Sequence, residues 1–237
     1  MPACERLPIV VISHHPETCG GRLMAHLRAQ APVQMVRPLC GQPLPSLERV
    51  AGIVVLGSHH SVNRSFPMLN EERRWLRQAL LLPKLGRNMP ILGICFGAQL
   101  IAQIAGAQIF QGASPEIGAH RVTPAQGQDW LTEAMEVMGW HQEGIGSVPE
   151  GGKLVARGNE AFPVQAFQWR QALALQFHPE TTPAMVQRWA ALHGANEAAL
   201  QLQLARLEPM RKWLDNTLHQ LFAPTTAVTP SAEPAEA

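Results

Sequence analysis

The sequence contains one cysteine whose neighbours could turn it into a nucleophile. Cys95 lies in the run PILGICFGAQL, where an apolar strand at 90–94 leads directly into a helix. Gly93 and Gly97 flank it at the spacing of a strand-to-helix elbow, a turn too tight for Cβ atoms at those positions. The positive end of the helix dipole would stabilise a thiolate, and the backbone N–H of Phe96 would face a developing oxyanion. The alternative interpretation is a buried, unreactive cysteine in a core strand.

A histidine and a glutamate two residues apart supply the second part of such chemistry. His178 and Glu180 occur in QFHPE, 83 residues after Cys95. In extended backbone, which Pro179 favours for the residue before it, the two side chains project to the same side. They would then provide a proton carrier and a carboxylate that orients it, as in triads with cysteine as the nucleophile. The alternative is a histidine at a strand end beside a surface glutamate.

Four short apolar runs alternate with helical patterns in the first half of the chain. The runs are continuous, as in strands covered on both faces, and they occupy 7–12, 33–36, 53–56 and 90–94. Helices are predicted between them at 17–30, at about 68–85 and at 98–105. This alternation predicts an α/β fold: a doubly wound, mainly parallel sheet flanked by helices, with the nucleophile elbow at its carboxyl edge.

After Gly106 the pattern changes to short segments separated by glycine, proline and polar residues. These segments predict a small antiparallel extension of the same sheet, at 107–110, 119–123, 153–157, 164–169 and 172–177. From Pro183 the pattern is helical, with a break at Pro209. We therefore predict one domain over residues 1–223, followed by a disordered Pro/Ala/Thr-rich tail at 224–237.

Composition argues against several classes of protein. Charged residues make up 16% of the 237 residues, and the net charge of +1 offers no basic stripe for phosphates. No window reaches the roughly 18 consecutive apolar residues of a membrane span, and the first apolar run is too short for a signal-peptide core. The four cysteines are scattered, with no CxxC pair. We therefore expect a cytoplasmic protein with no nucleic-acid or membrane partner.

Two pairs of adjacent histidines follow predicted strands, at His14-His15 and at His59-His60. Ligands collect at this edge of open α/β sheets, so a metal cluster is conceivable there. No cysteine or carboxylate at metal-ligand spacing accompanies the histidines. We interpret them as pocket lining and expect neither a metal nor a cofactor.

Together, GICFGAQL and QFHPE resemble the class I glutamine amidotransferases, whose glutaminase domains use Cys, His and Glu, and in particular their stand-alone, GMP-synthase-like group. The similarity covers about residues 7–222. Four further segments match the family. IVVLGSHHSV at 53–62 corresponds to its Gly-Gly-Pro-type loop, and PEIG at 115–118 corresponds to its Glu-Ile-Gly segment. GWHQE at 139–143 corresponds to its Trp-His-Gly-Asp-like stretch, and VPEGGKLVAR at 148–157 corresponds to its Leu-Pro-x-Gly segment.

This resemblance implies a reaction for the predicted triad. Cys95 would attack the γ-carboxamide of L-glutamine to give a γ-glutamyl thioester and ammonia, while His178 moves protons and Glu180 orients His178. The resemblance also implies an oxyanion hole formed by Gly57, Ser58 and Phe96. It further implies that Gln99, His141 and Gln142 bind the substrate.

The sequence departs from the family's pattern in two places. Ser58 replaces the second glycine of the oxyanion loop and His59 replaces its proline, which keeps a backbone donor but changes the loop. Gln142-Glu143 replaces the family's Gly-Asp, which bears on recognition of the substrate's head group. The ATP-pyrophosphatase half of GMP synthase has no counterpart in the sequence, so we do not expect GMP synthesis by this chain alone.

Three functions therefore follow from the sequence. The first is a glutamine amidotransferase that releases ammonia to a separate synthetase or acceptor protein. The second is a γ-glutamyl hydrolase acting on γ-glutamyl amines or peptides, with room beyond the γ-carbonyl between the loops at 58–63 and 141–146. The third is a catalytically quiet binding or regulatory protein, in which His59 distorts the oxyanion loop.

Overall fold

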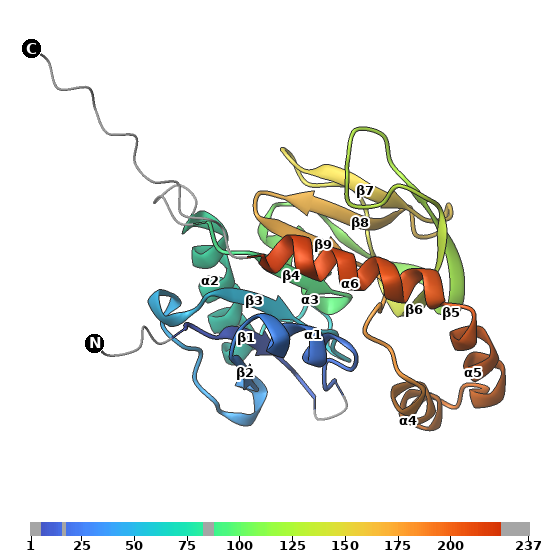
Figure 1. Ribbon diagram of the computed structural model, residues 1–237, viewed down its shortest axis with the longest axis horizontal. Coiled ribbons are helices and arrows are strands. Elements are labelled where there is room, and N and C mark those ends of the chain that lie inside the picture. Colours follow the sequence, from blue (N-terminus) through green and yellow to red (C-terminus); the bar gives the residue numbers. More distant parts are fainter. Residues whose placement is uncertain (1–5, 16–17, 83–87, 224–237) are drawn as a thin grey trace, which may run out of the picture.

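The computed structural model describes residues 6–15, 18–82 and 88–223 of the chain. One sheet runs through it in the strand order β2-β1-β3-β4-β9-β8-β6-β5-β7 (Figure 1). Its first five strands pair in parallel. They are β2 (Val33–Val36), β1 (Ile9–Ile12), β3 (Gly52–Val55), β4 (Ile91–Ile94) and β9 (Ala172–Leu175).

Helices cover both faces of these parallel strands, because alternate strand residues enter two separate hydrophobic cores. The first core contains Ile9 and Val11 and is covered by α1 (Leu23–Gln30) and α6 (Glu208–Phe222). The second contains Val10 and Ile12 and is covered by α2 (Pro67–Leu81) and α3 (Phe96–Ile104). Figure 1 shows α1 and α6 together on one side of the strands. The prediction of an α/β fold is confirmed.

The remaining four strands are antiparallel and form the other half of the sheet. They are β5 (Ile109–Pro124), β6 (Met135–Ile145), β7 (Lys153–Arg157) and β8 (Val164–Trp169). β5 pairs with β6 and β7, and β7 also pairs with β8, so these strands close on themselves like a barrel. The predicted small extension is therefore wrong in size, and the mainly parallel description fits only the first half of the sheet.

The sequence pattern missed β6 altogether and divided β5 into two segments. Gly139 and Gly144, together with polar side chains, interrupt the apolar alternation of β6, which removes the usual strand signal. β5 is one strand of 16 residues with a bulge between Gln111 and Glu116, so its two predicted parts belong together. Long pairing between β5 and β6 determines both strands more strongly than local propensity does.

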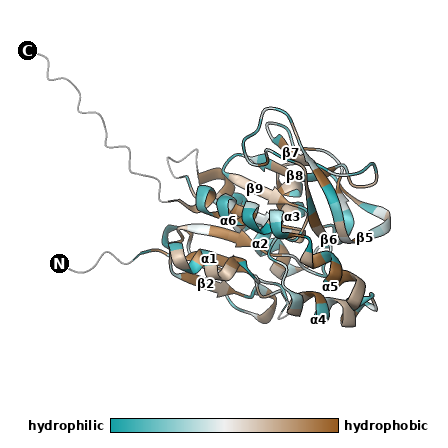
Figure 2. Ribbon diagram, turned by 45° about the vertical axis from the view of Figure 1, so that its right-hand side comes forward, coloured by the Kyte–Doolittle hydropathy of each residue, from teal (hydrophilic) through white to brown (hydrophobic). Residues whose placement is uncertain are grey.

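Three helices follow β9: α4 (Pro183–His193), α5 (Glu197–Ala205) and α6. Pro209 lies in the first turn of α6, where its missing N–H costs no hydrogen bond, so the predicted break is found between α5 and α6. Hydrophilic residues follow the outer side of α6 in Figure 2. No described helix has both the length and the hydrophobicity that crossing a membrane requires. The predicted tail at 224–237 lies outside the described residues.

Leu218 tests the contribution of α6 to the first core. Its side chain is fully buried, and its carbonyl oxygen accepts a hydrogen bond from the Gln30 side chain of α1. We expect Leu218→Ala to lower the free energy of unfolding by about 2–5 kcal/mol, because it leaves a cavity in the core. Urea unfolding followed by circular dichroism measures this, with Leu202→Ala as the control, since Leu202 is 75% exposed. Equally small changes in the free energy of unfolding for both substitutions would contradict the packing of Leu218 in the first core.

Candidate active site

Cys95 lies at a sharp turn between β4 and α3. Its backbone has φ 51° and ψ −105°, a conformation that non-glycine residues rarely adopt and that costs conformational energy. The flanking glycines are required sterically. A Cβ atom at Gly97 would lie 2.1 Å from the Val55 carbonyl oxygen, and one at Gly93 would lie 2.7 Å from the Gly97 backbone. The predicted elbow is therefore present in the structure.

His178 and Glu180 form a buried pair after the end of β9. His178 Nδ1 lies 2.8 Å from Glu180 Oε1, and the residues are 4% and 3% exposed. They lie in a turn and not in a strand, so the expected strand-like alternation is not what brings them together. The backbone N–H of His178 donates to the Met138 carbonyl oxygen of β6, and the ring packs edge-on against Trp189. These contacts hold the imidazole in one orientation.

Electrostatics in this pair favour a protonated histidine. Burial by itself lowers the pKa of His178, but attraction to the Glu180 carboxylate and to the Cys95 sulfur outweighs it and raises the pKa to about 10. His178 also hydrogen-bonds the Cys95 side chain. At neutral pH the ring is therefore an imidazolium between a carboxylate and the sulfur, which is the arrangement that stabilises a thiolate.

The loop after β3 brings Gly57 and Ser58 next to Cys95 and His178. A Cβ atom at Gly57 would lie 2.8 Å from His178 Cε1 and 3.6 Å from Cys95 Cβ, so only glycine fits against the imidazole. The N–H of Phe96 belongs to the first turn of α3, whose N–H groups lack partners within the helix. A small cavity of about 30 Å³ lies here, lined by Thr18, Gly57, Ser58, His59, Cys95, Trp140, His178 and Trp189.

A larger open pocket of about 500 Å³ also borders Cys95. The three predicted substrate-binding residues, Gln99, His141 and Gln142, all line it. The other lining residues come from the loop after β3, from β5 and β6 and from the end of α4: Ser58, His59, His60, Ser61, Gln111, Pro115, Ile117, Trp140, Glu143 and His193. The structure thus brings the sequence-predicted residues together around one thiol.

Gln99 and His141 are also engaged within the protein. Gln99 Nε2 donates to the Glu143 carbonyl oxygen at 2.9 Å and to Gln176 Oε1 at 3.2 Å. His141 Nδ1 lies 3.1 Å from the same Glu143 oxygen, and its Nε2 lies 3.0 Å from Glu116 Oε2. Burial lowers the pKa of His141 despite the nearby Glu116 carboxylate. Both nitrogens of His141 therefore face protein oxygens, and its ring serves to hold β6 in position.

Glu116 is a residue that the sequence placed in a family segment without assigning it a role. Its carboxylate accepts hydrogen bonds from Asn159 and Gln165 at 2.8 and 2.7 Å, and it lies 3.3 Å from His120 Nε2. Burial raises the pKa of Glu116, but the contacts with His141, His120 and Gln165 lower it further than burial raises it. The PEIG match was the only signal for this residue, and it could not indicate these partners.

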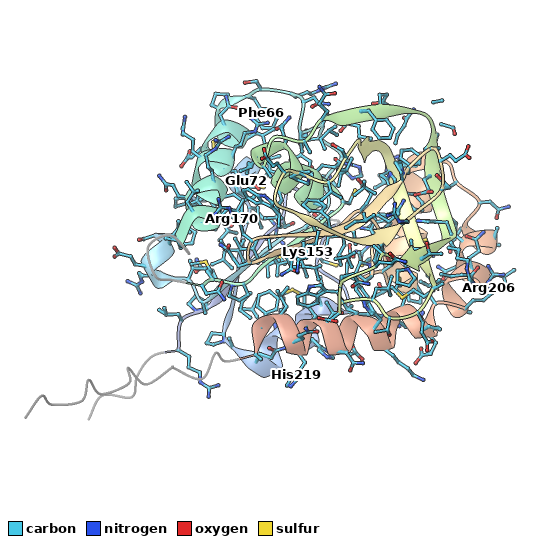
Figure 3. The ribbon with its side chains drawn as sticks, turned by 90° about the horizontal axis from the view of Figure 1, so that it is seen from above. Phe66, Glu72, Lys153, Arg170, Arg206 and His219 are labelled. Atoms are coloured by element: carbon cyan, nitrogen blue, oxygen red, sulfur yellow. The ribbon has the colours of Figure 1, made fainter. Side chains whose placement is uncertain are left out.

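The four histidines at the strand ends have different environments. His14 Nε2 lies 2.8 Å from Glu72 Oε2 of α2, and both side chains are buried beside Phe96. Figure 3 shows Glu72 on the inward side of α2. His59 and His60 line the larger pocket, and the His15 ring packs edge-on against His59. Within the described residues, no three or more His, Cys, Asp or Glu side chains are arranged to hold a metal ion.

Comparison with known proteins gives a consistent result. The sequence model of the family "Glutamine amidotransferase class-I" matches residues 24–188. GMP synthase [glutamine-hydrolyzing] from Porphyromonas gingivalis is 34% identical over 140 residues, which are 56% of this chain and 26% of that protein. A shorter relative from Thermococcus kodakarensis, named as one subunit of a glutamine-hydrolyzing GMP synthase, is 35% identical over 98 residues, which are 39% of this chain and 52% of that protein.

Solved structures agree on the fold. A glutamine amidotransferase from Thermotoga maritima superposes with a TM-score of 0.81 at 21% identity, covering 92% of this chain and 99% of the other. A glutamine amido transferase from Methylobacillus flagellatus gives 0.81 at 22% identity, covering 91% and 94%. The chain belongs to the class I glutamine amidotransferase family. It spans only about a quarter of the length of the GMP synthases that match it first.

The elevated pKa of His178 makes a prediction about stability and pH. A histidine that titrates at about 10 when folded and at about 6.5 when unfolded stabilises the folded state fully below pH 6.5. This stabilisation is lost as the pH rises through 10. We expect Glu180→Gln to lower the pKa of His178 and to weaken this dependence between pH 7 and 10. NMR titration of the His178 Cε1–H signal and urea unfolding at each pH test it. An unchanged pKa of His178 in Glu180→Gln would contradict the conclusion that the Glu180 carboxylate raises this pKa.

Proposed function

We propose that this chain hydrolyses the γ-amide of L-glutamine through a covalent thioester on Cys95, and that it does so in the cytoplasm. The observation that carries this proposal is the thiol at a strained elbow, beside a buried imidazolium whose other nitrogen is held by a carboxylate. The proposal treats the five parallel strands as a doubly wound unit that presents Cys95 at its carboxyl edge. Membership of a glutamine amidotransferase family supports the choice of substrate.

The proposed reaction has two halves. The Cys95 thiolate attacks the γ-carbonyl carbon, and the N–H groups of Phe96 and of the Gly57–Ser58 loop stabilise the oxyanion. The carbon–nitrogen bond then breaks as the His178 imidazolium gives its proton to the leaving ammonia. Neutral His178 next takes a proton from water, which attacks the thioester and releases glutamate. The thiolate and the imidazolium are restored, and Glu180 orients His178 in both halves.

The ammonia released would serve an acceptor reaction on a separate protein. Two kinds of relative support this part of the proposal: long GMP synthases of which this chain matches about a quarter, and a shorter protein named as one subunit of GMP synthase. The proposed partner is therefore a synthetase-type protein that consumes ammonia.

A second candidate is hydrolysis of γ-glutamyl amines or peptides with the same triad. The observation that favours it is the open pocket of about 500 Å³ next to Cys95, since pockets of this size accommodate ligands larger than glutamine. The thioester step is the same in both reactions, and only the leaving amine differs. Competition by L-glutamine for the Cys95 thiol separates the two.

Labelling by a glutamine-mimicking diazo ketone tests the proposal without requiring turnover. We expect intact-mass analysis to find one adduct, peptide mapping to place it on Cys95, and excess L-glutamine to prevent it. Cys95→Ala should abolish labelling, whereas Cys40→Ala should leave it unchanged, because Cys40 is an exposed thiol outside the site. An adduct that L-glutamine does not prevent would favour the γ-glutamyl hydrolase. No adduct on the folded protein would favour the catalytically quiet protein and overturn the proposal.

A further inference from the structure

One buried ionisable pair beside the elbow takes no part in the reaction derived above. His14 follows the end of β1 and Glu72 lies in α2, with His14 Nε2 2.8 Å from Glu72 Oε2. Their side chains are 1% and 0% exposed. Among the described residues, His14 Nδ1 and Glu72 Oε1 find no hydrogen-bond partner. In this part of the chain, each residue of the pair therefore leaves one buried polar atom unsatisfied.

Attachment of α2 to the sheet does not require this pair. The buried side chains of Leu69, Leu76 and Leu80 carry the helix into the second core. A buried ionic pair often stabilises a fold no better than apolar residues of similar volume, because both groups lose their hydration. Such a pair does restrict geometry, since each polar atom depends on the position of its partner. The contribution of His14 and Glu72 is therefore a fixed position for what they contact.

The group in contact with this pair is the Phe96 ring. The His14 and Phe96 ring centroids are 4.6 Å apart, and Phe96 is 1% exposed in the second core. Phe96 directly follows Cys95, whose strained backbone persists only where the surrounding structure holds it. Gly97 is held by its close approach to Val55. The His14 ring holds the residue between them, which carries a proposed oxyanion donor.

We propose that His14 and Glu72 are positioning residues for the oxyanion hole. Glu72 fixes the His14 ring, the ring fixes Phe96, and the N–H of Phe96 is thereby aimed at the γ-carbonyl oxygen of the substrate. This inference rests on the proposed function. Neither His14 nor Glu72 is among the described residues that line the two cavities at Cys95, so the pair acts through Phe96 and not by contact with the substrate.

Two reagents that modify Cys95 separate this role from a general structural one. The glutamine-mimicking diazo ketone places a carbonyl oxygen in the oxyanion hole, whereas methyl methanethiosulfonate reacts with a thiolate at sulfur and has no carbonyl group. The measured quantity is the second-order rate constant at Cys95, followed by peptide mapping. We expect Glu72→Leu, which releases the His14 ring, to lower the diazo ketone rate about 10- to 100-fold. The thiosulfonate rate should change less than about threefold, because that reaction develops no charge on a carbonyl oxygen.

Two further substitutions in α2 are the matched controls. Glu72→Gln keeps an oxygen that accepts a hydrogen bond from His14, so its diazo ketone rate should stay within about threefold of wild type. Glu71→Leu changes the neighbouring exposed glutamate of the same helix and should leave both rates unchanged. An equal loss for both reagents in Glu72→Leu, or no loss for either, would overturn the inference.

A second variant covers the case in which Glu72→Leu does not fold. His14→Leu combined with Glu72→Leu removes both polar groups and leaves no unpaired charge in the core. We expect this double variant to fold, as checked by circular dichroism, and to show the same selective loss with the diazo ketone. If neither variant folds, the pair is structural and the inference is refuted. A wild-type protein that reacts with the thiosulfonate but not with the diazo ketone would instead refute the proposed function.

Discussion

Cys95 leaves β4 with φ 51° and begins α3 in the next residue, and this turn exists only because Gly93 and Gly97 carry no side chain. The close approach of Gly97 to Val55 fixes α3 against the end of β3. The loop after β3 is thereby held beside the thiol, and Gly57 lies against the His178 ring. The strained turn at Cys95 thus determines where the thiol, the first turn of α3 and the loop after β3 meet.

β6 joins the antiparallel half of the sheet to this turn. Its Met138 oxygen accepts from the His178 backbone, and its Trp140 oxygen lies against the Cys95 sulfur. Its next residues form a wall of the pocket and are held by Gln99 and Glu116. The parallel strands β4 and β9 lead to Cys95 and to the His178–Glu180 pair, while the antiparallel strands β5 and β6 form part of the wall of the adjacent pocket. Both halves of the sheet therefore contribute residues to the walls around the thiol.

Three buried histidine–carboxylate pairs surround the site: His14 with Glu72, His141 with Glu116, and His178 with Glu180. Burying such groups costs free energy unless each finds a partner, so each pair fixes the elements that carry it. Only His178 faces the thiol, and only there do the sulfur and the carboxylate together raise the pKa to about 10. The same two residue types thus form a pair that faces the Cys95 sulfur at one position and pairs that hold neighbouring elements together at the others.

Local sequence determined the elbow and the parallel strands, because a Gly-x-Cys-x-Gly turn and continuous apolar runs depend on neighbours in the chain. It also identified His178 and Glu180, which contact each other across a single turn. Only the tertiary structure decided that β6 is a strand, that His14 turns inward to Glu72 and that Glu116 holds His141. Those contacts join residues from 13 to 58 positions apart, and their partners come from packing, which local propensity does not encode.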